Sequence, residues 1–109
     1  MKKLFVIALA LAAVAAFAPF ASAGKVIRVG DDYFIKPGGG TATVSKNSTV
    51  KWTNVGRSAH TVTVVSGPVK FNKAPLLKGT SYSRKMTRTG TYRLVCRYHS
   101  GQRMTLKVQ

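Results

Sequence analysis

The chain has 109 residues, with 18 lysines and arginines against two acidic residues, so its formal net charge is +16. The two carboxylates, Asp31 and Asp32, are adjacent in sequence, which excludes catalysis by a pair of separated carboxyl groups. So strong a positive field attracts acidic proteins and anionic surfaces, but it says nothing about the fold.

The N-terminus has the pattern of a secretory signal peptide. Lys2 and Lys3 precede an apolar run over residues 4–17, and the small residues Ala21-Ser22-Ala23 follow. The run has 14 residues, too few for a transmembrane anchor, so we predict a cleaved leader over residues 1–23. Cleavage leaves residues 24–109 as one domain of 86 residues with a net charge of +14, exported to the periplasm or the cell exterior.

Short β-type runs, separated by turn-forming residues, follow the leader. The predicted strands are 25–29, continued or followed by 33–35, then 41–44, 49–54, 60–65, 80–86, 91–96 and 103–108. Residues 66–79 contain two glycines and two prolines and predict a long irregular connection. Seven or eight short strands at this spacing predict an all-β sandwich.

The alternation within these runs separates apolar from charged residues. The second set, which we expect on the outer, solvated faces, consists of Lys51, Arg93, Arg97, Arg103 and Lys107. A small exported domain usually gains stability from disulfides, but a single cysteine cannot form one within the chain. A bound metal is the obvious replacement.

The metal-ligand candidates are Cys96, His99 and Met104, spaced C-x2-H-x4-M around one connection, and His60, the only other histidine. A thiolate, two imidazoles and a weak axial thioether suit a copper ion that alternates between Cu(I) and Cu(II). Other interpretations stay open at this point. Taken singly, the cysteine and methionine also suit a buried core, and the histidine and cysteine also suit zinc.

Three segments resemble the cupredoxins of the plastocyanin and pseudoazurin type. "VIRVGDDYFIKP" is similar to the family's first strand and turn, and "VKWTNVGRSAHTV", residues 50–62, resembles the segment with its first histidine ligand. Residues 76–108 resemble its C-terminal half, including the Gly-Thr-Tyr turn before the cysteine. The resemblance covers nearly the whole exported domain, and the C-x2-H-x4-M loop is its most specific part.

The resemblance implies a Greek-key β-sandwich with one copper ion at one end. It implies His60, Cys96 and His99 as strong ligands and Met104 as the weak axial one. Asn54 and Thr61 match positions whose hydrogen bonds hold the ligand loops. The family's activity is one-electron transfer through the exposed C-terminal histidine, so we expect a monomeric electron carrier and not an enzyme.

The chain departs from the family pattern around the site. Ala59 and Tyr98 stand where the family commonly has proline before each histidine, and the loop lacks the family's small apolar docking residues. We expect instead a basic rim that steers an acidic redox partner, although solvated loop charge explains the arginines equally well. The candidate docking residues are Arg57, Arg97, Tyr98, Gln102 and Arg103.

Two other functions compete. The same ligands would serve a carrier or buffer that hands over copper rather than electrons. A metal-free domain that binds cell-wall polymers or nucleic acid would use the positive charge alone, with a steep salt dependence. Against the latter, the basic residues are scattered, and export removes the protein from cytoplasmic nucleic acid, so we expect no nucleic-acid partner. Association with the anionic cell envelope stays open.

Overall fold

The computed structural model describes residues 24–109, and the predicted leader lies outside the described residues. These residues form eight strands, and no helix among them is long and apolar enough to cross a membrane. The strands are β1 (Lys25–Val29), β2 (Thr41–Val44), β3 (Thr49–Asn54), β4 (His60–Ser66), β5 (Asn72–Leu76), β6 (Ser81–Lys85), β7 (Gly90–Val95) and β8 (Arg103–Val108).

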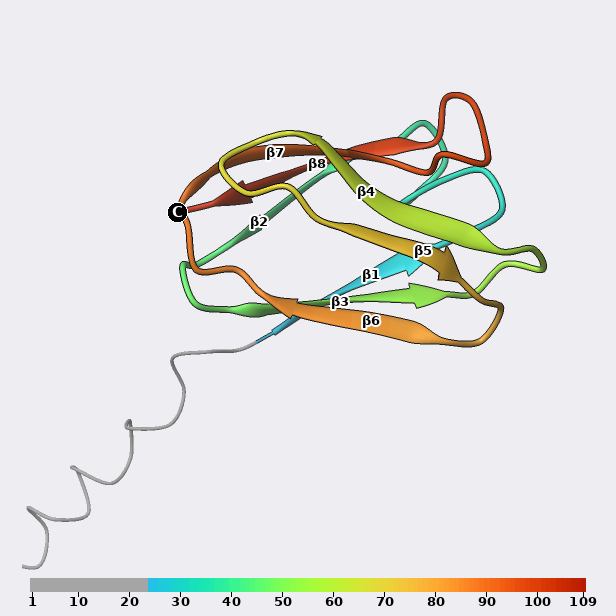
Figure 1. The fold of residues 1–109 in the computed structure, drawn as a ribbon, viewed down its shortest axis with the longest axis horizontal. Coiled ribbons are helices and arrows are strands. Elements are labelled where there is room, and N and C mark those ends of the chain that lie inside the picture. Colours follow the sequence, from blue (N-terminus) through green and yellow to red (C-terminus); the bar gives the residue numbers. More distant parts are fainter. Residues whose placement is uncertain (1–23) are drawn as a thin grey trace, which may run out of the picture.

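The strands form two facing sheets, which confirms the predicted all-β sandwich (Figure 1). One sheet has the order β1-β3-β6 and the other the order β2-β8-β7-β4-β5. The β1–β3 and β2–β8 pairs are parallel, and the remaining pairs are antiparallel. The chain passes repeatedly from one sheet to the other, as in a Greek key, so each sheet contains strands that are distant in sequence.

The predicted alternation determines which side chains enter the core. Trp52 and Tyr92 are fully buried between the sheets, and the inward residues of β4, β7 and β8 join them in one apolar cluster. Trp52 packs against Phe71 and Tyr82 with ring centroids 5.9 Å away in both cases. The five basic residues predicted to face outward are all exposed. These five positive charges therefore lie on the solvated faces of the sandwich.

One local prediction is wrong, and for another the structure excludes one of two alternatives. The stretch 66–79 contains a strand, β5, which pairs with β4 at the edge of the larger sheet. All its residues except Leu76 are exposed, so it has no apolar alternation to reveal it, and an edge position tolerates Pro75. Residues 33–35 do not extend the first strand. Only a single bridge joins Phe34 to Val29, which folds this segment back over β1.

Strands β1, β3 and β7 all end at the same end of the sandwich, and the loops that follow them meet there (Figure 1). These loops contain residues 30–34, 55–59 and 96–102. They bring together Asp31, His60 and the Cys96–His99 segment, which are separated by up to 68 positions in the chain. The metal-ligand candidates therefore lie on the loops, and the two sheets form the rigid base beneath them.

Candidate metal centre

Cys96 follows the last residue of β7 and points into the sandwich, where it is 4% exposed. Its backbone N–H donates to the Gln102 carbonyl at 3.0 Å, which extends the β7–β8 ladder by one step. The Thr61 N–H donates to the Cys96 sulfur at 3.4 Å. This bond holds the sulfur, the atom through which a cysteine binds metals, in a fixed position beside the first histidine segment.

Both histidines turn a ring nitrogen toward this sulfur. The Cys96 Sγ lies 3.7 Å from His60 Nδ1 and 3.4 Å from His99 Nδ1, and the two imidazole rings are 4.7 Å apart. All three ligand atoms lie within 4.8 Å of one another. Ligand atoms that share one ion at bonds of roughly 2.0–2.3 Å stand about 3.5–4 Å apart in a trigonal arrangement. The spacing of the three atoms therefore fits a common metal ion.

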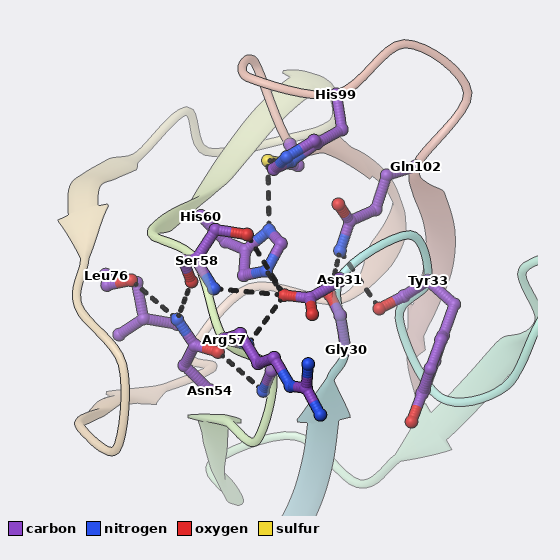
Figure 2. Close-up of polar contacts among 12 residues, drawn as sticks. Gly30, Asp31, Tyr33, Asn54, Arg57, Ser58, His60, Leu76, His99 and Gln102 are labelled. Atoms are coloured by element: carbon purple, nitrogen blue, oxygen red, sulfur yellow. Dashed lines mark hydrogen bonds and ion pairs between the residues drawn. The ribbon is translucent and has the colours of Figure 1, made fainter.

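Asp31 orients His60 from behind. Its Oδ1 atom lies 3.1 Å from His60 Nε2, so His60 can donate through Nε2 and keep the Nδ1 lone pair for a metal (Figure 2). The same oxygen accepts from the backbone N–H groups of Ser58 at 3.1 Å and Arg57 at 2.8 Å, and from the Ser58 hydroxyl at 3.1 Å. The pKa of Asp31 is held well below its usual range. The largest cause is the hydrogen bond from the Ser58 backbone, the next is the bond from the Arg57 backbone, and His60 has a smaller effect.

The loop that approaches Asp31 depends on a glycine. A Cβ atom at Gly56 would collide with the Asp31 carboxylate, so a larger residue there would displace the loop. Sequence reasoning missed the role of Asp31. The signal in the sequence was weak: two acids directly after the first predicted strand of a very basic chain.

Asn54 and Thr61 lie where they can hold the ligand loops. The Asn54 side chain is buried and donates to the carbonyls of Ser58 at 2.8 Å and Leu76 at 2.9 Å, while its oxygen accepts from Gly56 N–H at 2.9 Å (Figure 2). It therefore ties the loop before His60 to the end of β5.

Thr61 joins the two ligand segments. Its hydroxyl accepts from the Arg97 N–H at 2.8 Å, in addition to the bond from its own N–H to the cysteine sulfur. Thr61, which follows His60, is thus bonded both to Cys96 and to Arg97. A displacement of either segment would strain both bonds.

The fourth predicted ligand lies deeper. Met104 is 3% exposed and pairs with Leu94 in the β7–β8 ladder, whereas Cys96 lies opposite Gln102. Met104 is thus two residues farther along β8 than the residue facing the cysteine, and it belongs to the apolar core. Its role as the axial ligand stays a prediction at this point.

The predicted docking residues do not all lie on the surface. Arg57, Arg97, Tyr98 and Arg103 are exposed, Tyr98 by 53%. Gln102 is 2% exposed, so its placement on a docking surface is wrong. Polar residues of a short loop look solvated in sequence, but the pairing with Cys96 turns this side chain inward.

Comparison with known proteins identifies solved structures with the same fold. No family model matches the chain, and no curated protein matches it. Among solved structures, the Cu(I) form of an amicyanin mutant matches at 24% identity over 84% of this chain and 87% of the other, with a TM-score of 0.69. Another amicyanin mutant, in its reduced state, matches at 25% identity over 79% and 82%, with a TM-score of 0.68.

A larger protein contains the same fold. A copper-containing nitrite reductase from Thermus scotoductus matches with a TM-score of 0.69 at 21% identity, over 79% of this chain but 22% of its own. The similarity to the amicyanins thus extends over most of both chains. The similarity to the nitrite reductase covers only about a fifth of the reductase chain. The chain therefore has the fold of amicyanin, the cupredoxin fold that its sequence predicts.

Proposed function

We propose that this protein is an exported type 1 copper protein that carries single electrons between redox partners. The observation that carries the proposal is the meeting of His60, Cys96 and His99 within 4.8 Å on a sandwich of the amicyanin fold. One copper ion bound there would supply one-electron exchange between Cu(I) and Cu(II). The proposed protein is a carrier and has no substrate of its own.

The surroundings of the ligands suit electron transfer because they hold the ligands still. His60 is fully buried and is oriented by Asp31, and Cys96 is held by the Thr61 N–H. Ligands locked by hydrogen bonds keep nearly the same geometry in both oxidation states, which lowers the cost of changing between them. His99 is the partly exposed member, so we assign it as the point where electrons enter and leave.

The proposed partner is an acidic redox protein. Arg57, Arg97 and Arg103 are exposed on the loops at the ligand end of the sandwich and at the start of β8, together with Tyr98. A basic rim around the electron-transfer residue would raise the association rate of an acidic partner, and added salt would lower it. Stopped-flow exchange with an acidic cytochrome at several salt concentrations tests this. A rate that does not depend on salt contradicts it.

The optical spectrum of the copper-loaded protein tests the metal centre. We expect intense visible absorption from thiolate-to-copper charge transfer in the Cu(II) form, and its loss on reduction. Cys96→Ser removes the thiolate and should abolish the absorption, whereas the distant Ser83→Ala should keep it. A Cu(II) form without this absorption, with the thiol of Cys96 still reduced, refutes the proposal.

The alternative function is copper transport or buffering. A surface hollow of about 270 Å³ is lined by Cys96, His99 and residues 100–103. Through this hollow, a ligand group of another protein could approach the bound copper and take it over. Two rates separate the functions: electron exchange with redox proteins, and loss of copper to a chelator. Slow electron exchange with every redox protein, combined with rapid loss of copper to the chelator, favours copper transport over electron transfer.

A further inference from the structure

We propose that the outer face of the larger sheet carries a binding site for a phosphate group, held between the side chains of Arg93 and Arg103. The evidence is a hollow lined by both arginines, their placement on neighbouring strands, and the lack of an acidic partner for either one. The site goes beyond the proposed function and needs no copper, because His60, Cys96 and His99 do not line it.

Arg93 and Arg103 are diagonal neighbours on β7 and β8, which lie side by side in the larger sheet (Figure 1). Arg93 pairs with Thr105, and Arg103 pairs with Val95, so each arginine is two positions from the other's partner. Both arginines are exposed, whereas Leu94, the residue after Arg93, is fully buried in the core. Both arginine side chains therefore leave the outer face of the sheet. Diagonal neighbours on one face are about 7–8 Å apart, within reach of long side chains.

A hollow of about 320 Å³ is lined by both arginines and by Val65, Val95 and Thr105. This volume is at the lower end of the range for ligand pockets, roughly 300–1,000 Å³, so the hollow suits a small group. Residues 38–40, all glycines, also line it and lie close against β8. A Cβ atom at Gly39 would come within 3.1 Å of the Arg103 carbonyl oxygen. This edge of the hollow therefore consists of backbone alone, and no side chain of the edge covers the space.

The hollow is positively charged, and no carboxylate lines it. Asp31 and Asp32, the two acids of the chain, belong to the loop after β1 at the ligand end of the sandwich. Within residues 24–109, the one ion pair joins Asp31 to His60, so neither arginine has an acidic partner. Like charges that are close together on a sheet repel each other. A bound anion would remove this repulsion, which is a physical reason for an anion to occupy the hollow.

A phosphate monoester, or free phosphate, is the anion that best matches two guanidinium groups. Each planar guanidinium offers parallel N–H donors, which match two oxygen atoms of a phosphate. A phosphate monoester carries about 1.5 to 2 negative charges at pH 7, so one such group balances both arginines. A carboxylate carries a single charge and leaves one arginine unbalanced. Inorganic phosphate and a lipid headgroup that ends in a phosphate monoester both present the required chemistry.

The smaller sheet contains a matched pair of charges on its own outer face. Lys51 pairs with Ser83, and Lys85 pairs with Thr49, so the two lysines are also diagonal neighbours. Both lysines are exposed. An ammonium group is a point charge and lacks the fork of a guanidinium. Substitution of Lys51 therefore changes the net charge as much as substitution of Arg93 does, but it leaves the hollow on the larger sheet intact.

Calorimetric titration of the purified exported protein with inorganic phosphate, at constant ionic strength, tests the site. Arg93→Gln and Arg103→Gln should each weaken phosphate binding at least about tenfold, because each removes charge-assisted hydrogen bonds. Lys51→Gln is the control for net charge and should weaken binding less than about threefold. An equal loss in Arg93→Gln and Lys51→Gln overturns the site, because the overall charge alone would then attract the phosphate. Arg103 also belongs to the basic rim proposed above, whereas Arg93 does not, so Arg93→Gln separates the two proposals.

Vesicles distinguish the two sources of the phosphate group. Sedimentation of the protein with vesicles of phosphatidylcholine, with and without phosphatidic acid, measures binding to a lipid phosphate monoester. Binding that requires phosphatidic acid, and that is lost in Arg93→Gln but kept in Lys51→Gln, identifies a lipid headgroup as a ligand. The same variant pattern with inorganic phosphate, and no binding to the vesicles, identifies free phosphate. Absence of saturable binding in both the calorimetric and the vesicle experiments overturns the proposal.

Discussion

Asn54→Ala should destabilise the protein strongly, because this side chain ties the loop before His60 to the rest of the sandwich. Asn54 is 1% exposed and makes three hydrogen bonds, to Ser58, Leu76 and Gly56. The substitution leaves the buried Leu76 carbonyl unpaired, at about 1–3 kcal/mol, and removes two part-buried bonds of about 0.5–1.5 kcal/mol each. Partial relaxation of the loop gives an expected loss of about 3 kcal/mol in the free energy of unfolding.

Urea unfolding of the metal-free protein, followed by the fluorescence of the single tryptophan, Trp52, measures this loss. For a domain of this size the melting temperature should fall by about 12–24 °C. Asn72→Ala is a suitable control, because Asn72 is exposed and accepts one hydrogen bond, from the Thr63 hydroxyl at 2.6 Å. It should cost about 1 kcal/mol. If Asn54→Ala costs no more than Asn72→Ala, the side chain does not hold the loop as argued.

The other predictions concern Asp31, Thr61 and the leader. Asp31→Asn should destabilise the metal-free protein at neutral pH and Asp32→Asn should not. Since the pKa of Asp31 is lowered on folding, urea titrations should show the Asp31→Asn loss shrinking as pH falls below about 4. Thr61→Val leaves the Arg97 N–H unpaired and should cost about 1–3 kcal/mol by urea unfolding; an unchanged midpoint contradicts this. The mass of the exported protein should correspond to a chain beginning at Gly24, and a full-length mass refutes the leader.

Residue types and their alternation predicted most of the strands, and the structure brings three of the four expected ligand residues together. The period of two in 49–54, 91–96 and 103–108 placed the apolar residues of these strands in the core, as the structure has them. The single cysteine and the two histidines of the chain indicated one metal site, and they do meet. Prediction failed at β5, because an exposed edge strand buries too little to impose an apolar pattern on its sequence.

The sequence by itself determined the fold class, the excess positive charge and the chemistry of the donors, because these depend on composition, period and spacing. Only the tertiary structure decided which side chains surround the site. Asp31 lies 29 positions before His60, and Gly30 and Tyr33 lie about 70 positions before Gln102, so local pattern could not pair them. Whether Gln102 faces solvent or Cys96 depends on the register of β7 with β8 and on the turn that joins them. A shift of one residue in that register would move the side chain to the opposite face.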